Sequence, residues 1–108
     1  MDQQYLGVVE EQNLTTVIGG RLYRFRFYPF RNQMYMDLHS GEDYIFAGKR
    51  IMTNRWILPD YLAAENGNLR FETYAPDANE YVWWEGFNKK FRLVAYSYKE
   101  IKDMENKS

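Results

Sequence analysis

The sequence predicts an all-β fold: a small single-domain β-sandwich or partly open β-barrel, built from hairpins in a meander, with at most one short helical turn. Three observations predict it. Apolar and polar residues alternate with a period of two in several segments, turn residues separate those segments, and aromatic residues, which favour strands, make up 19% of the 108 residues. We expect one domain at 1–108, with its β core at about 13–98 and a charged C-terminal tail at 99–108 that frays or forms a short helix.

The first hairpin is predicted at a pair of glycines. Residues 14–18 (LTTVI) are rich in β-branched side chains, and Gly19 and Gly20 follow them. Glycine adopts positive φ without steric cost, so this dipeptide is typical of a tight hairpin turn. A second strand follows in GRLYRFRFY at 20–28, and we expect Pro29 to limit it because proline lacks a backbone donor.

Aromatic and arginine side chains alternate along this second strand. Tyr23, Phe25 and Phe27 point to one face, and Arg24 and Arg26 point to the other. The strand is therefore either the base-stacking strand of a nucleic-acid binder or a core strand whose arginines face water. A stacking platform needs both kinds of side chain on the same exposed face, so the alternation favours the core strand.

The remaining elements complete the predicted meander and a closing strand. Alternation recurs at 34–39, with polar turns at 31–33 and 40–43 on either side, and a strand resumes at 44–51 with a kink or bulge at Gly48. One short helical turn is expected after Pro59, a favoured first helical position. Further strands are predicted at 69–74 and 91–98, with a polar loop at 75–80.

Charge and cysteine content exclude several classes of protein. The chain has 14 basic and 15 acidic residues and a net charge of −1, whereas a duplex-DNA or polyanion binder carries a basic excess. Cysteine is absent, which excludes disulfides and thiolate metal sites. The N-terminal residues lack the pattern of a signal peptide, and no apolar run is long enough to cross a bilayer. These features predict a soluble intracellular product.

The search for catalytic chemistry finds no candidate residues. His39 is the only histidine, so a site with several histidine ligands is excluded. Asp37 and Ser40 flank it, but a catalytic triad needs residues that converge in space, and neighbours in one strand diverge. We therefore predict no catalytic, cofactor-binding or metal-binding residues, and no enzyme.

The most unusual segment is YVWWEGF at 81–87, in which large aromatic residues crowd together. One interpretation is that one tryptophan caps the core while its neighbour lies on the surface. The other is a protein–protein contact, because exposed tryptophan and tyrosine are enriched at interfaces and one small core can hardly hide twenty aromatic residues. On this second interpretation the candidate anchors of the contact are Trp83, Trp84 and Phe87. Arg24 and Arg26 are the candidate polar rim around them.

The run GRLYRFRFYPFRNQMYMDL at 20–38 resembles the small plug proteins of contractile-tailed phage baseplates, a family typified by cyanophage baseplates. In that family a glycine turn leads to a tyrosine, an alternating strand, a polar turn and an aromatic strand that ends in Asp-Leu or Asp-Ile. The positions that resemble these are Gly20, Tyr23, Phe25, Phe27, Tyr35, Asp37 and Leu38. Segments at 47–51, 58–61, 67–71 and 91–96 resemble later family elements in the same order, while a tryptophan common in the family is Met34 here.

The resemblance implies a non-enzymatic structural component of a contractile phage tail baseplate, a plug or tube-end protein that links the hub and the tail tube by protein–protein assembly. It implies other baseplate and tail proteins as partners (hub, tail tube and wedge), a symmetric homo-oligomer, and a place in the virion after assembly in the host cytoplasm. It implies no cofactor, small-molecule substrate, membrane or nucleic acid. Two alternatives stay open: an OB-type single-stranded nucleic-acid-binding module, and a small regulatory or host-takeover protein.

Overall fold

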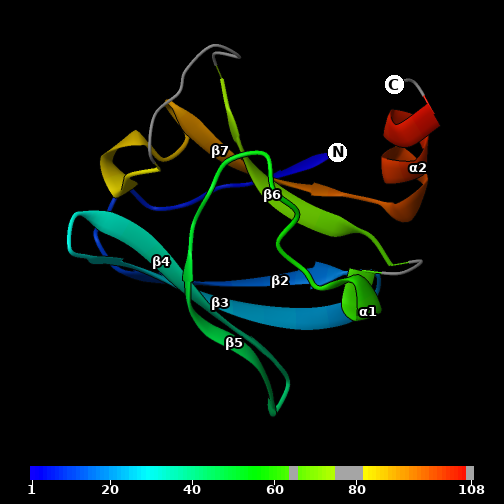
Figure 1. The fold of residues 1–108 in the computed structure, drawn as a ribbon, viewed down its shortest axis with the longest axis horizontal. Helices are drawn as coiled ribbons and strands as arrows, with labels where there is room; N and C mark the ends of the chain where they lie inside the picture. The colour runs from blue at the N-terminus through cyan, green and yellow to red at the C-terminus, as the bar shows by residue number, and fades with distance from the viewer. Residues whose placement is uncertain (64–65, 75–81, 107–108) are drawn as a thin grey trace.

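The computed structural model places seven strands in two antiparallel sheets, and it describes residues 1–63, 66–74 and 82–106 (Figure 1). The four-stranded sheet has the order β2 (Gln12–Ile18), β3 (Arg21–Phe30), β4 (Gln33–Ser40) and β5 (Asp43–Arg50). The three-stranded sheet has the order β1 (Asp2–Gln4), β7 (Phe91–Tyr96) and β6 (Asn68–Thr73). The sheets lie as two layers, one above the other in Figure 1, which confirms the all-β prediction. The polar loop expected at 75–80 lies outside the described residues.

The four-stranded sheet is a meander because each of its hairpins has a turn of two residues. Gly19 and Gly20 have φ of 58° and 82°, and Arg31 and Asn32 have φ of 50° and 64°, as a type I′ turn requires at both central positions. Gly41 has φ of 62° at the first central position of the third turn, where a type II′ turn requires glycine. The turn residues thus match the right-handed twist of the strands that they join.

The prediction that Pro29 limits its strand is wrong, because β3 continues to Phe30. Phe30 and Gln33 flank the second turn and form a hydrogen-bonded pair, so the backbone of Pro29 points away from β4 and toward β2. Strand β2 pairs with β3 only as far as the Gln12–Phe27 pair and does not reach Pro29. The missing donor of Pro29 therefore leaves no ladder hydrogen bond unmade.

The bulge predicted at Gly48 is confirmed. Met36 pairs with Lys49 but Leu38 pairs with Phe46, so β5 has an additional residue between these pairs. Gly48 has φ of 66°, and its N–H donates to Asp37 Oδ1 at 2.8 Å. The ladder shifts a second time on the other side of Leu38, which makes β5 the most irregular strand of this sheet.

The core lies between the two sheets and receives the inward face of every long strand. Phe25 and Phe27 are 1% and 0% exposed, whereas Arg24 and Arg26 are exposed, as the alternation predicts. Phe27 meets Phe71 of the opposite sheet edge to face, with ring centroids 5.7 Å apart. The strand GRLYRFRFY is therefore a core strand.

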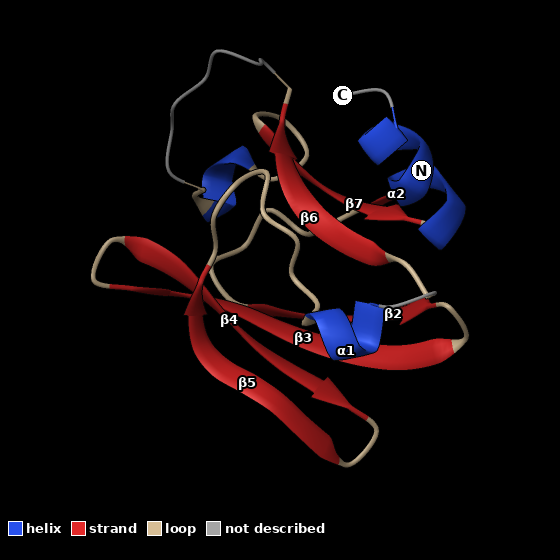
Figure 2. Ribbon diagram, turned by 45° about the vertical axis from the view of Figure 1, so that its right-hand side comes forward, coloured by secondary structure: helices blue, strands red, loops and turns tan. Residues whose placement is uncertain are grey.

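The structure contains the helical turn expected after Pro59, a helix in the charged tail, which was one of the two outcomes expected there, and one further turn that was not expected. Helix α1 (Asp60–Ala63) follows Pro59 as predicted, and a 3₁₀ turn, η1, spans Trp84–Gly86. Helix α2 (Tyr98–Asn106) occupies most of the charged tail and lies beside the three-stranded sheet (Figure 2). None of the helices in the described part of the chain is long and apolar enough to cross a membrane.

Helix α2 begins with a capping box. The Ser97 side chain accepts a hydrogen bond from the Glu100 N–H at 3.2 Å, and the Glu100 carboxylate accepts one from the Ser97 N–H at 3.0 Å. The N-terminal amine of Met1 forms an ion pair with the same Glu100 and so ties the start of the chain to α2. Strand β1 accordingly pairs with β7, ahead of the β core that we expected to begin near residue 13.

Replacement of Phe25 or Phe27 by alanine is expected to lower the free energy of unfolding by about 3–5 kcal/mol, because each leaves a cavity in the core. Arg24→Ala is the control on the same strand and is expected to cost under about 1 kcal/mol, since its side chain is exposed. Chemical denaturation of the purified variants measures both values. Similar losses for phenylalanine and arginine variants would contradict the core-strand assignment.

Candidate assembly surface

The outer face of the four-stranded sheet carries exposed and half-buried side chains. We call it the meander face; its residues are Val17, Leu22, Arg24, Arg26, Tyr28, Phe30, Tyr35, Asp37, His39 and Tyr44. At one end Val17 and Leu22 are direct partners across β2 and β3, and they are 59% and 47% exposed. This end is an apolar patch.

The opposite end of the meander face is aromatic. The rings of Tyr28 and Tyr35 stack at 6.2 Å between centroids, and Phe30 meets Tyr35 edge to face at 6.1 Å. Phe30 is 55% exposed although it belongs to a central strand. Aromatic side chains offer large contact areas at low entropic cost, so this end has the composition of an interface.

Charged residues occupy the centre of the meander face and are tied to one another. The Arg26 guanidinium donates to Glu11 Oε1 at 2.7 Å, lies 3.5 Å from Asp37 Oδ2, and sits over the Tyr28 ring at 4.6 Å. The hydrogen bond to Glu11 raises the pKa of Arg26. Asp37 also accepts the Tyr28 hydroxyl at 2.9 Å; burial, and then this hydrogen bond, raise the pKa of Tyr28. The centre is thus held in one arrangement before any partner arrives.

Arg24 is different from its neighbour Arg26. Among the residues that the structure describes, Arg24 has no carboxylate partner, and its guanidinium donates only to the Gly41 carbonyl oxygen at 3.4 Å. It borders a shallow hollow of about 330 Å³ that Asn13, Thr15 and His39 also line. Arg24 is therefore a cation with room beside it for a partner's side chain.

The structure removes Phe87 from the predicted anchors. Phe87 is 0% exposed, and its ring stacks on Phe71 with centroids 5.9 Å apart. It also lies 6.5 Å from the ring of Phe27. The turn η1 directs Phe87 into the core, so it supports the fold instead of offering a surface.

Trp83 and Trp84 are both half-buried and pack against the core. Neither is fully buried as a core cap would be, and neither is fully exposed as a free surface anchor would be. The Trp83 indole N–H donates to Glu85 at 3.4 Å. Arg24 and Arg26 belong to the outer face of β3, whereas η1 lies at the end of the three-stranded sheet (Figures 1 and 2). The structure therefore does not bring the predicted anchors and the predicted rim together in one site.

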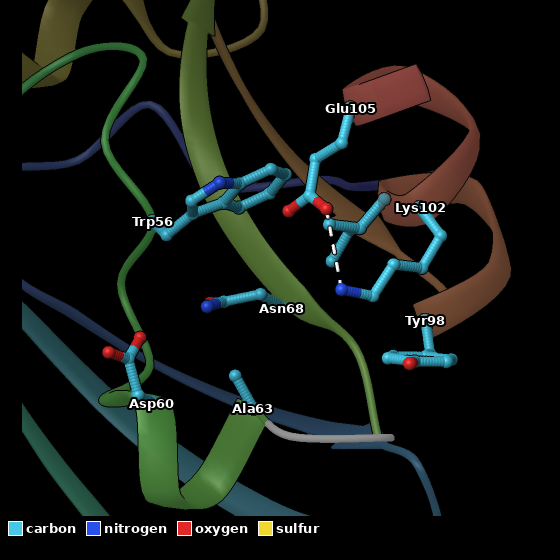
Figure 3. A pocket seen from close by; sticks show the side chains of 8 residues that line it. Trp56, Asp60, Ala63, Asn68, Tyr98, Lys102 and Glu105 are labelled. Atoms are coloured by element: carbon cyan, nitrogen blue, oxygen red, sulfur yellow. Dashed lines mark hydrogen bonds and ion pairs between the residues drawn. The ribbon is translucent and has the colours of Figure 1, made fainter.

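A pocket of about 250 Å³ lies between α1, α2 and Trp56 (Figure 3). Three of its polar side chains are engaged within the chain: Lys102 pairs with Glu105 at 3.3 Å, and the Asn68 amide bonds to both backbone groups of Leu58 at 2.8 and 3.1 Å. Trp56 supplies an aromatic wall. We find no arrangement of an acid, a base and a nucleophile in this pocket.

A second ionic cluster lies on the outer face of the three-stranded sheet. Glu72 is 7% exposed and binds Arg70 at 2.8 Å and Arg92 at 3.2 Å, and it accepts the Tyr96 hydroxyl. Burial alone would raise the pKa of Glu72, but the hydrogen bonds from Tyr96 and Arg70 outweigh it and the pKa is lowered. Burial, and then the hydrogen bond to Glu72, raise the pKa of Tyr96. Arg70 lies over the Trp56 ring at 4.6 Å, so the cluster fastens the segment before α1 to the sheet.

His39 lies on the meander face, where its ring meets that of Tyr44 edge to face at 5.5 Å. In the described part of the chain no three side chains of the metal-binding types gather in one place. His39 thus takes part in the packing of an outer face.

Sequence reasoning found the two arginines of the meander face but missed its apolar and aromatic members. The outward positions of β3 include Leu22, Tyr28 and Phe30 as well as the arginines. The same period-two alternation would have assigned all of them to one face. Their pairing with Val17 and Tyr35 could not be read without the register of the neighbouring strands.

The structure is that of a small β protein with two layers of antiparallel sheet and an exposed face whose apolar, cationic and aromatic composition resembles that of protein interfaces. No curated protein matches the chain. The family described as cyanophage baseplate Pam3 plug gp18 matches it over residues 4–98. The chain therefore belongs to this family of baseplate plug proteins, and its role is that of a structural component of a phage tail baseplate. The matched region covers all seven strands except the first residues of β1, and it ends where α2 begins.

Replacement of Glu72 by glutamine is expected to lower the free energy of unfolding at pH 7 by about 1.5–3 kcal/mol, because two arginines lose their buried carboxylate. The pKa of Glu72 in the folded protein lies below its ordinary value of 4.5, so the carboxylate stabilises the fold above that pH. Its contribution is lost as the pH falls through the folded pKa. The difference between wild type and variant should therefore shrink below about pH 4.5 in denaturation at several pH values.

Glu11→Gln is the matched control, since Glu11 pairs with Arg26 at 57% exposure of its side chain. Its cost is expected to be under about 1 kcal/mol at pH 7. A loss at Glu72 no larger than that at Glu11 would show that the cluster does not fasten the sheet.

Proposed function

We propose that the chain is the plug of a contractile phage tail baseplate, a protein that links the hub to the end of the tail tube by assembly and without catalysis. The observation that carries the proposal is the meander face, which combines exposed apolar and aromatic ends with a fixed ionic centre in a member of the plug family. Such a face supplies the buried anchors and polar contacts that stable interfaces use.

The meander face would contact other baseplate and tail proteins, with hub, tail tube and wedge as the candidates. Several copies would stand symmetrically around the tail axis, after assembly in the host cytoplasm. Symmetry requires each copy to make the same contacts, and a ring of more than two copies needs two complementary surfaces on each copy, so the meander face would supply one of them. Shape and charge complementarity, not reaction chemistry, would select the partners.

The absence of catalysis belongs to the same proposal. Several ionic groups of the described structure are engaged in pairs, as for Arg26 with Glu11 and Glu72 with Arg70. His39 packs on Tyr44 instead of facing a nucleophile. These contacts support a static role for the side chains that an enzyme would use.

The alternative of an OB-type single-stranded nucleic-acid binder has no support in the arrangement of side chains. Tyr23, Phe25 and Phe27 are buried, so they offer no ring to a base. Arg26 is engaged by Glu11 and Asp37, so of the two arginines at the centre of the meander face only Arg24 is without a carboxylate among the described residues. We therefore expect that the protein does not show the salt-dependent retention of single-stranded DNA that a nucleic-acid binder shows. Filter binding at salt concentrations from about 50 to about 200 mM measures this retention.

Replacement of Phe30 or Tyr44 by alanine is expected to weaken incorporation into the baseplate, with a loss of up to about 2 kcal/mol of binding at a central contact. Both side chains are exposed, at 55% and 61%, so the isolated variants should stay folded. The measurement is complementation of a phage that lacks the gene, followed by quantification of the protein in purified baseplates.

The matched controls are Tyr5→Ala and Tyr61→Ala, since these tyrosines are 75% and 73% exposed and lie outside the meander face. They should incorporate as wild type does. Equal incorporation of face and control variants would place the contact surface elsewhere. Absence of the wild-type protein from the baseplate would overturn the proposed function itself.

A further inference from the structure

The two sheets have four edge strands, and the described structure protects three of them. Residues 53–57 run along the edge of β6, where Asn54 donates to Phe71 O at 2.7 Å and Ile57 donates to Leu69 O at 3.0 Å. Strand β5 is interrupted by two register shifts and carries Asp43, Lys49 and Arg50. Strand β1 has three residues. Short strands, bulges and charges are the usual means by which proteins prevent an edge from pairing with another chain.

Strand β2 has none of these protections. Its seven residues, QNLTTVI, contain no charge and no proline, and it pairs with β3 without a register shift. The adjacent β1 reaches it through a side chain, where the Thr16 hydroxyl donates to Gln4 Oε1 at 2.8 Å. No backbone hydrogen bond between described residues joins the free edge of β2 to another segment.

The hairpin fixes which backbone groups point off this edge. Ile18 and Arg21 flank a turn of two residues and form a hydrogen-bonded pair, and such pairs alternate along the ladder. Thr16, Leu14 and Gln12 therefore bond to β3. The N–H and C=O groups of Asn13, Thr15 and Val17 point outward, and the side chains of these three residues are all exposed.

We propose that the free edge of β2 accepts an extended, acidic segment of a neighbouring baseplate protein, which adds a fifth strand to the sheet. This inference rests on the proposed function, because it names the contact through which the plug joins its neighbour. The added strand gains main-chain hydrogen bonds from Asn13, Thr15 and Val17. Specificity comes from the side chains that it places on the meander face.

The charge of the segment follows from Arg24. Thr15 lies between Arg24 and the free edge, since the two residues are direct partners across β2 and β3. Threonine is short, and Thr15 and Arg24 line the same hollow, so the guanidinium has room to turn from the Gly41 carbonyl toward the added strand. A carboxylate placed opposite Thr15 on that strand would give Arg24 the ion pair that it lacks among the described residues.

A second copy of β2 fits this edge less well. Strand β2 contains no charged residue, and Glu11, the carboxylate just before it, is already bound by Arg26 of its own chain at 2.7 Å. A second copy therefore offers Arg24 no free carboxylate, whereas an acidic segment of another chain does. The edge therefore suits a different, acidic chain.

Hydrogen exchange tests the inference directly. The protein is exchanged free and in purified baseplates, the baseplates are dissociated under conditions that quench exchange, and the amides are read residue by residue. In the free protein Leu14, Thr16 and Ile18 should be protected while Asn13, Thr15 and Val17 exchange rapidly. In the baseplate the second set should become protected as well, by about tenfold or more.

Two pairs of variants test the edge and the charge separately. Val17→Lys places a charge on the edge and should lower incorporation about tenfold, whereas Val9→Lys, at a valine of 48% exposure before the strand, should not. Arg24→Glu should lower incorporation by a similar factor of about ten, and Arg24→Lys should retain most of it.

The outcomes separate this inference from the proposed function. Wild-type protein that is present in baseplates, but whose Asn13, Thr15 and Val17 amides stay unprotected there, overturns the added strand and leaves the baseplate role intact. Protection of these amides in a concentrated solution of the protein alone identifies a second copy as the occupant and also overturns the proposal. Equal incorporation of Val17→Lys and Val9→Lys counts against it in the same way.

Discussion

Strand β3 imposes the constraint on which the rest of the structure depends, because it has to serve two faces at once. Its inward residues fill the centre of the core, where Phe27 meets Phe71 and Phe87 of the opposite layer. Its outward residues form the middle of the meander face. A slip of one residue in the register of β3 would put arginines into the core and turn the phenylalanines toward the outer face. The glycine turn before β3 and the Arg31–Asn32 turn after it, both with positive φ, hold the strand in the required register.

This two-sided pattern is also why the sheet could be predicted from the sequence. Alternation, turn residues and Gly48 are local signals, and they gave the four meander strands, the bulge and the burial of Phe25 and Phe27. Helix α2 also has a local signal, the Ser97–Glu100 capping box, which favours the helix over the frayed tail, the two alternatives that the sequence left open. The bounds of β3 were misjudged because the cost of Pro29 depends on whether a neighbouring strand is present.

The parts that could not be predicted depend on contacts between residues far apart in the chain. Strand β1 has three residues, too few to show an alternation of apolar and polar side chains. It forms because it pairs with the edge of β7 and because the Met1 amine forms an ion pair with Glu100. Phe87 seemed a surface anchor for a related reason: an aromatic-rich segment does not reveal which ring η1 turns inward. For the candidate site, sequence gave Arg24 and Arg26 but not Tyr35 and Tyr44, which join them only through the register of three strands.

The meander face combines a rigid centre with Arg24, a cation that has no carboxylate partner among the described residues, and this combination has a consequence for assembly. Asp37 holds Tyr28, Arg26 and the bulge at Gly48 together, so these side chains lose little freedom when a partner covers them. A face that is already ordered gains affinity from contact area and pays little of the ordering cost that binding usually requires. Arg24 contributes differently, because a cation without a carboxylate gains most from a partner that supplies one and rejects a partner that brings another cation. The fixed centre thus provides affinity, and Arg24, beside the uncharged edge of β2, provides the choice of partner.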